Sequence, residues 1–198
     1  IVRAPRGSTI DDIAHVVNRK IKWIEKTQKY VLESRELSKP KNFVEGEEFL
    51  YLGKKLTLHL IPIGSVLVDE NSLCAPLGNK ELVQHAILSW YRRQARTIFL
   101  ILANTYATKM DVTYSVIRIK NSRTRWGSCG KNGSINLNWR LVMAPIEVIE
   151  YLVIHELTHT IYRNHSKRFY NFVEKFCPNY KAMERWLQAN SHIMKMFR

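Results

Sequence analysis

The apolar residues in the first third of the chain follow a helical spacing and then a strand-like one. Isoleucines and valines recur at helical spacing from residue 10, which predicts an amphipathic helix to about Glu36 that the pattern Thr9-x-x-Asp12 begins. Shorter apolar runs follow, and they predict a hairpin over residues 49–60 and a second strand pair over residues 66–74. We therefore expect an α+β amino-terminal region, rich in β-strands, over residues 1–76.

The remaining residues, 77–198, form the second expected region. It begins with a long helix over about residues 79–108, whose predicted buried stripe is Leu82, Ala86, Trp90, Ala95, Phe99 and Leu102. Alternating residues 112–120 predict a half-buried strand, and a turn at residues 130–133 leads into a second strand at residues 134–138. Pro145 suits the first position of the next helix, which carries a long apolar run.

That helix contains the motif His155-Glu156-Leu157-Thr158-His159. Residues four apart on a helix lie on one face, about 6 Å apart, so His155 and His159 can bind the same metal ion. Glu156 then lies beside the ion, where its carboxylate can take a proton from a water molecule that the ion activates. The motif predicts a Zn²⁺-dependent hydrolase with Glu156 as the catalytic base.

His165 is the expected third zinc ligand, although an uninterrupted helix would carry it about 9 Å beyond His159. We expect the chain to turn back at Arg163-Asn164, because asparagine tolerates the left-handed conformation that ends helices. Ser166 would then cap a further helix. Two alternatives remain open: Glu174 or Glu184 replaces His165 as a ligand, or the three histidines are ordinary helix and loop residues.

Length and composition narrow the class of protein. The chain has 198 residues, of which 45% are hydrophobic, enough for a substantial core. No stretch approaches a transmembrane span, and no charged and apolar leader precedes a cleavage site. Three widely spaced cysteines favour a reducing, cytoplasmic location.

The net charge of +14 suits nucleic acid, a nucleotide or an acidic protein as partner, and it also suits a solvated surface. The basic residues are dispersed, and no zinc finger, aromatic RNA-binding strand pair or basic zipper accompanies them. Nucleic acid or nucleotide therefore remains a secondary partner class, and the sequence does not determine an oligomeric state.

Three motifs together resemble the YgjP-like metallopeptidase family, which is distantly similar to SprT-like and minimal gluzincin peptidases. They are Thr124-Arg125-Trp126-Gly127-Ser128-Cys129, Leu137-Asn138-Trp139-Arg140-Leu141, and the His155 motif followed by Asn164-His165-Ser166. The resemblance covers nearly the whole chain, including the turn Tyr51-Leu52-Gly53. It implies a zincin-like domain with the active-site helix packed on a small mixed sheet, His155, His159 and His165 as zinc ligands, Glu156 as catalytic base, and a protein or peptide substrate.

The resemblance also suggests where substrate binds. In zincin-like peptidases an edge strand pairs with the extended substrate, and Ile135, Asn136, Leu137 and Asn138 would take that place, although a purely structural strand explains them equally well. We expect Arg125 and Trp126 to anchor the sheet to the active-site helix. Candidates for stabilising the developing oxyanion are Tyr162, Arg168 and Tyr170.

Two other functions compete with peptide hydrolysis. A metal-dependent phosphohydrolase acting on nucleotides is favoured by the positive charge and by Lys167-Arg168 near His165. The third hypothesis is a DNA-associated protease or binding factor. Its affinity for DNA would fall steeply as the salt concentration rises.

Overall fold

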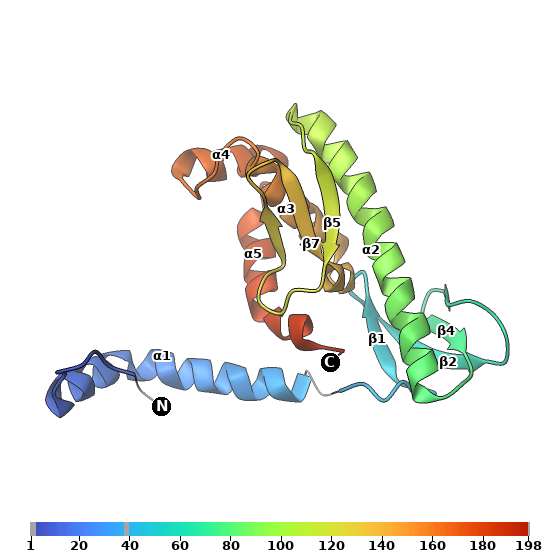
Figure 1. Ribbon diagram of the computed structural model, residues 1–198, viewed down its shortest axis with the longest axis horizontal. Helices are drawn as coiled ribbons and strands as arrows, with labels where there is room; N and C mark the ends of the chain where they lie inside the picture. The colour runs from blue at the N-terminus through green and yellow to red at the C-terminus, as the bar shows by residue number, and fades with distance from the viewer. Residues whose placement is uncertain (1–2, 38–39, 198) are drawn as a thin grey trace. The chain divides into compact units, whose positions relative to one another are not determined.

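The computed structural model describes residues 3–37 and 40–197, which divide into two compact units, Ile1–Lys39 and Pro40–Arg198. The first unit contains helix α1 (Ile10–Leu37), drawn in blue in Figure 1. The predicted cap is confirmed, because the Thr9 hydroxyl donates to the Asp12 carboxylate over 2.6 Å while the Asp12 N–H donates back to Thr9 Oγ1. The boundary expected between residues 76 and 77 stays a prediction.

The second unit begins with a four-stranded sheet, in the order β1-β2-β4-β3. Its strands are β1 (Glu48–Tyr51), β2 (Lys54–Ile61), β3 (Leu67–Val68) and β4 (Ser72–Pro76). β1 pairs antiparallel with β2, and β3 with β4, so both predicted strand pairs are confirmed. A parallel pairing of β2 with β4 joins them.

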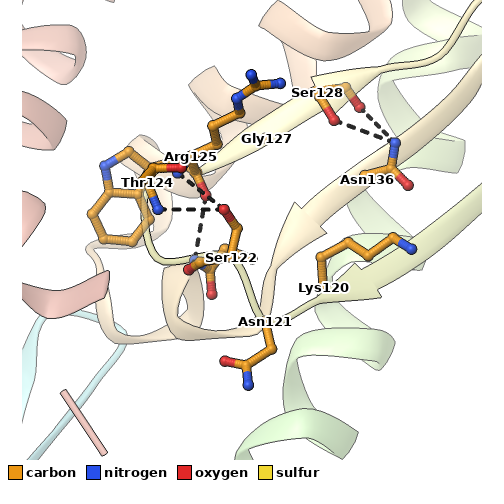
Figure 2. A pocket seen from close by; sticks show the side chains of 10 residues that line it. Lys120, Asn121, Ser122, Thr124, Arg125, Gly127, Ser128 and Asn136 are labelled. Atoms are coloured by element: carbon orange, nitrogen blue, oxygen red, sulfur yellow. Dashed lines mark hydrogen bonds between the residues drawn. The ribbon is translucent and has the colours of Figure 1, made fainter. Parts of the chain in front are cut away.

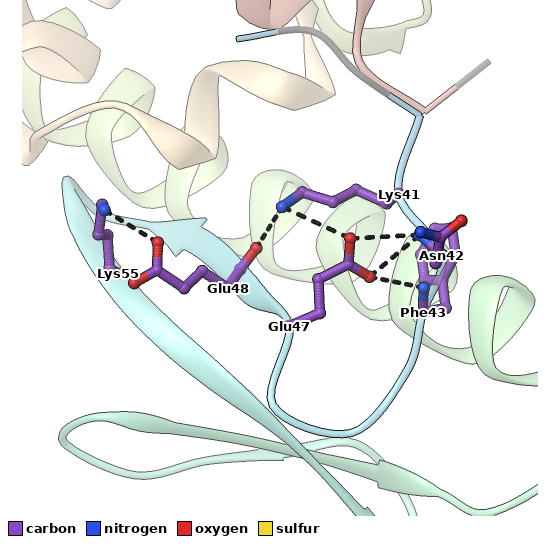
Figure 3. Close-up of polar contacts among 6 residues, drawn as sticks. All are labelled: Lys41, Asn42, Phe43, Glu47, Glu48 and Lys55. Carbon is purple, nitrogen blue, oxygen red and sulfur yellow. Dashed lines mark hydrogen bonds and ion pairs between the residues drawn. The ribbon is translucent and has the colours of Figure 1, made fainter. Parts of the chain in front are cut away.

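The segment that enters this sheet is fixed by the carboxylate of Glu47 (Figure 3). That carboxylate accepts the backbone N–H of Asn42 and of Phe43, the latter over 2.6 Å, and Lys41 Nζ donates to the carbonyl of Glu48 over 2.7 Å. The bonds hold Phe43 at a positive φ of 59°. Its ring is buried and packs 5.6 Å, centroid to centroid, from that of Phe49.

The hairpin turn between β1 and β2 contacts the segment that leads into helix α3 (Ile146–Thr158). Leu52 and Gly53 both have positive φ, 48° and 80°, as a tight hairpin turn requires. Their N–H groups donate to the carbonyls of Val142 and Met143 over 2.9 and 3.1 Å. A Cβ on Gly53 would lie 3.0 Å from Pro145 Cγ, so the close approach requires glycine.

Helix α2 (Lys80–Met110) is capped by Asn79, whose side chain accepts the N–H of Leu82 over 3.0 Å. The long predicted helix is confirmed, but its stripe begins differently. Leu82 is half exposed, because Val83 and Ile87 turn toward the core in its place.

A second, three-stranded sheet follows in the order β5-β7-β6, with parallel β5–β7 and antiparallel β6–β7 pairing. The strands are β5 (Val116–Lys120), β6 (Gly127–Cys129) and β7 (Ser134–Asn138). β7 pairs on both sides, so the edge position expected for Ile135, Asn136, Leu137 and Asn138 is wrong. The edge of the sheet beside β7 belongs to β6, which pairs with no other strand among the described residues and which the sequence pattern did not predict.

Helices cover the inner face of this sheet, where Ile135 and Leu137 are fully buried. Helix α2 contacts β5, helix α3 (Ile146–Thr158) contacts β6, and α4 (Lys167–Phe176) and α5 (Tyr180–Ala189) pack in turn on α3. Two 3-10 helices lie at Trp139–Met143 and Ser191–Lys195. α3 contacts both α2 and β6, in agreement with the expected packing of the active-site helix on a small mixed sheet (Figure 1). The α+β class is confirmed. Among the described residues, no helix combines the length and apolarity needed to cross a membrane.

Candidate metal centre

Helix α3 brings His155 and His159 to the same place at its carboxyl end. Pro145 is the residue before the helix rather than its first residue, and the apolar run behind the motif is buried, with Ile149 and Val153 fully enclosed. The helix ends at Thr158, and His159 is its cap with φ −67° and ψ −11°. One turn of helix therefore separates the two imidazoles.

His165 reaches the same place because the chain leaves the helix earlier than expected. Thr160 and Ile161 donate their N–H groups to Leu157 and Thr158, which makes a tight turn directly after His159. Asn164 is not among the described non-glycine residues with positive φ, so the left-handed turn expected there is wrong. The predicted cap is confirmed, since Ser166 Oγ accepts the N–H of Phe169 over 3.4 Å and begins α4.

The three imidazoles converge through their Nε2 atoms. His165 Nε2 lies 3.1 Å from His155 Nε2 and 3.2 Å from His159 Nε2. Ligand atoms that hold one tetrahedral zinc at about 2.0–2.1 Å are about 3.3–3.4 Å apart, so the observed spacing fits that ion closely. Neither Glu174 nor Glu184 joins this group, which is the cluster of metal-binding side chains found among the described residues.

The remaining ring nitrogens of two imidazoles have partners that orient them. His159 Nδ1 donates to the carbonyl of Tyr162 over 3.0 Å, which leaves its Nε2 unprotonated. The Tyr151 hydroxyl oxygen lies 3.4 Å from His155 Nδ1. In the His155 tautomer with an unprotonated Nε2, the Nδ1–H donates to this oxygen. The ring of Phe169 lies 4.6–4.9 Å, centroid to centroid, from all three imidazoles and forms an apolar support.

Burial keeps the imidazoles of His155 and His159 neutral. It lowers the pKa of His155 to about 3, with the neighbouring imidazoles adding to the effect, and it also lowers the pKa of His159. Neutral imidazole is the form that binds metal, so both side chains are ready to ligate at neutral pH.

Glu156 lies beside this cluster and is only 4% exposed. Its Oε2 atom is buried without a hydrogen-bond partner among the described residues. Burial raises the pKa of this carboxyl to about 8. A cation bound by the histidines would supply the missing favourable charge, and this orphaned oxygen supports the fit of the site to a metal.

The cluster opens into a cavity of about 310 Å³. Its lining includes the three histidines, Glu156, and residues from β6 and the loops, namely Arg125, Gly127, Ser128, Cys129 and Arg163.

The expected candidates for oxyanion stabilisation are not among the lining residues of this cavity; they were Tyr162, Arg168 and Tyr170. Arg125 is exposed rather than an anchor. Trp126 is buried and anchors the start of β6 through an Nε1–H bond of 3.2 Å to the carbonyl of Leu187, which is on α5 and not on the active-site helix as expected.

Arg163 is a site residue that the sequence did not indicate as functional. Its guanidinium donates to the carbonyls of Gly130 and Lys131 over 3.1 and 3.0 Å and lies 3.9 Å from Cys129 Sγ. These bonds join the loop that carries His165 to the turn between β6 and β7.

The model of the YgjP-like, metallopeptidase domain family matches residues 1–190. The chain belongs to the YgjP-like metallopeptidase family. As a member, this YgjP-like protein is a metallopeptidase, hence a hydrolase that uses a metal ion and acts on peptides.

Two crystal structures of metallopeptidase zymogens resemble part of this YgjP-like chain. Pyrococcus abyssi abylysin is 25% identical, with 46% of this chain and 92% of that one aligned and a TM-score of 0.42. Methanocaldococcus jannaschii jannalysin is 23% identical, with 46% and 91% aligned and a TM-score of 0.40. No significant match was found among curated proteins.

Proposed function

We propose that this YgjP-like protein is a zinc-dependent peptidase in which His155, His159 and His165 hold the metal and Glu156 is the general base. The observation that carries the proposal is the convergence of three Nε2 atoms beside one buried carboxylate whose Oε2 has no hydrogen-bond partner among the described residues. A cytoplasmic location is part of the proposal, supported by the absence of a disulfide among Cys74, Cys129 and Cys177.

The residues of the chain have separate roles in this reaction. Zinc, when bound, lowers the pKa of a water molecule and polarises the substrate carbonyl. Glu156 takes the proton of the attacking water at its free Oε2 and delivers it to the leaving amine. Gly127 leaves the carboxylate room beside β6, and Phe169 keeps the back of the site apolar.

Substrate would bind along β6, whose outer edge pairs with no strand in the part of the chain that the structure describes and lies beside the metal cavity. An extended peptide can add to such an edge through main-chain hydrogen bonds. β6 lines the cavity with Gly127, Ser128 and Cys129, so a peptide bound along it would lie next to Glu156. This transfers the substrate-binding role expected of β7 to its neighbour. Asn136 and Asn138 of β7 line an adjoining cavity instead.

Replacement of Glu156 by Gln tests the proposal. The variant should bind zinc as the wild type does and lose proteolysis, because glutamine keeps the shape of the side chain and cannot take a proton. Glu147→Gln, an exposed change at the start of α3, is the matched control and should retain activity.

The substrate panel should hold unfolded protein, DNA-bound protein and nucleoside triphosphates. Phosphate or diphosphate release without peptide cleavage would contradict the proposal in favour of a phosphohydrolase. Cleavage by the Glu156→Gln variant at the wild-type rate would remove Glu156 as the base.

A further inference from the structure

The metal cavity is one of three cavities that share lining residues. A larger one, of about 490 Å³, shares Arg125, Gly127 and Ser128 with it (Figure 2). A third, of about 300 Å³, shares Lys120 and Asn121 with the second. The three therefore form a continuous track, here called the basic track, from Glu156 across the end of the three-stranded sheet to helix α2.

The charge along the basic track is almost entirely positive. Among the described residues that line it, Glu156 is the sole carboxylate, and it lies at the metal end. The cations are Arg92, Arg93 and Arg96 on α2, Lys120 at the end of β5, Arg125 before β6, and Arg163. None of them forms an ion pair with a carboxylate in the described ranges, and Arg163 alone uses its guanidinium for backbone carbonyls.

The fold places Lys120 on the solvent side of the sheet. Val116, Arg118 and Lys120 are exposed, whereas Ile117 and Ile119 alternate with them toward the core. Asn136 lies on the same outer face, in register with Arg118 and Ser128, and its amide donates to Ser128. Figure 2 shows this polar floor, with the Lys120 side chain standing free of the hydrogen bonds drawn there.

A buried cation adds to the field at the far end. Arg140 is 4% exposed, and its guanidinium donates to Asn121 and to the carbonyl of Met196. Burial, with the charges of Arg92 and Arg123, lowers its pKa to about 10. Uncompensated positive charge of this kind attracts anions to the neighbouring surface.

The ligand chemistry follows from what the basic track lacks. Single-stranded nucleic acid is held by bases stacked on aromatic side chains. The two tryptophans that line the track are buried, Trp126 at 9% and Trp139 at 1% exposure, and the guanidiniums of Arg92 and Arg140 lie over the Trp139 ring. Carboxylates need only cations and amide donors, which the track provides.

We propose that the basic track binds acidic side chains of the peptide substrate on one side of the scissile bond, an inference that rests on the proposed peptidase function. A peptide added to β6 runs directly from the metal cavity into the cavity floored by Asn136, where Arg125 and Lys120 pair with its first carboxylates. Further acidic residues reach Arg93 and Arg96. The protein then selects extended peptide segments that are rich in Asp and Glu as substrates.

Two pairs of quenched fluorescent peptides test this with the zinc-loaded full chain. The two peptides of a pair have the same scissile bond, and one carries Asp and Glu where the other carries Asn and Gln. In the first pair these residues lie on the amino side of the scissile bond, and in the second pair they lie on its carboxyl side. In one pair, kcat/KM should favour the acidic member by about tenfold, because each exposed ion pair contributes about two- to fivefold. The preference should shrink as salt rises.

The double variant Arg96→Gln with Lys120→Gln removes two of the pairing cations and should reduce this ratio several-fold while cleaving the neutral peptide normally. Lys109→Gln, on the same helix and outside all three cavities, is the matched control and should keep the preference. Equal cleavage of acidic and neutral peptides by the wild type, or an equal loss for both in the double variant, overturns the proposal and leaves the peptidase function intact.

A binding measurement distinguishes failure of the proposed acidic-peptide site from failure of the proposed peptidase function. A labelled acidic peptide should bind the Glu156→Gln protein and lose about tenfold in affinity in the background of the double variant. If such binding is seen and no peptide is cut by the wild type, the proposed peptidase function fails and the acidic-peptide site stands. Tighter binding of single-stranded DNA, lost in the double variant, would overturn the assignment in favour of nucleic acid.

Discussion

The carboxylate of Glu156 lies against the backbone of Gly127, so close that a Cβ at residue 127 would lie 2.5 Å from Oε1 and 2.9 Å from Cδ. The contact joins helix α3 to strand β6. This contact explains why residue 127 of the Thr124–Cys129 motif is glycine. The φ of Gly127 does not require glycine, but the small space between its backbone and Glu156 does.

Gly127→Ala should therefore displace Glu156 and lower kcat/KM by more than about tenfold, because small misplacements of a catalytic group cost rate steeply. Zinc content should stay at the wild-type level. Overpacking should also destabilise the protein by about 1–3 kcal/mol.

Glu156→Ala provides the matched background for the stability measurement. In that background the alanine at residue 127 meets open space, so urea unfolding should show little further destabilisation. An equal loss in both backgrounds would mean that the glycine serves the strand itself rather than Glu156.

His165→Ala should weaken zinc binding by more than about 100-fold, since even loss of a residue that only orients a ligand costs about 10–100-fold. Competition with a chelator measures the affinity, and His85→Ala, an exposed histidine on α2, is the control. Retention of tight zinc binding by His165→Ala would return attention to Glu174 or Glu184 as the third ligand.

Arg163→Ala should weaken zinc binding by about tenfold, because its bonds to the carbonyls of Gly130 and Lys131 hold the loop before His165. Arg168→Ala, which removes an equal charge from exposed surface on α4, should leave the affinity unchanged. If both variants lose affinity equally, charge rather than position accounts for the effect.

The metal-free protein should lose stability as pH rises from about 6.5 to 8. Burial raises the pKa of Glu156 from 4.5 to about 8, so in this window the unfolded chain has released the proton while the folded protein keeps it. Rising pH then favours unfolding, by about 1–2 kcal/mol over the window. His155 acts in the opposite sense only below pH 6.5, because its pKa is lowered from that value to about 3.

Urea unfolding in the presence of a chelator at the two pH values measures this loss. Glu156→Gln should abolish it, and zinc should reduce it in the wild type, since a nearby cation favours the ionised carboxylate. The same pH slope in wild type and variant would show that other groups cause it.

Local patterns in the sequence were sufficient for most of the elements and for the cluster of histidines. Helical spacing joined His155 to His159, and the serine cap at Ser166 correctly set the start of α4. These features depend on residues within a few positions of each other. Leu82 shows the limit even there, because the packing of α2 on its neighbours rather than its own spacing decided which residues face the core.

Pairing between distant segments was not predictable in the same way. β6 has three residues and no alternating pattern, so nothing local marked it as the edge strand or placed β7 in the centre. The turn before His165 also formed without a left-handed Asn164, since hydrogen bonds directly after His159 redirect the chain. Arg163 and Gly127 acquire their roles only through contacts with residues about 30 positions away.

The shortness of β6 has a consequence for the behaviour of the protein in solution. An unpaired strand edge is a site at which copies of a protein aggregate, and a very short edge offers few backbone groups to a second copy. β6 exposes such an edge over only three residues, Gly127–Cys129. In the proposed function the sheet can thus accept a peptide beside the metal while offering little template for the growth of a continuous intermolecular sheet.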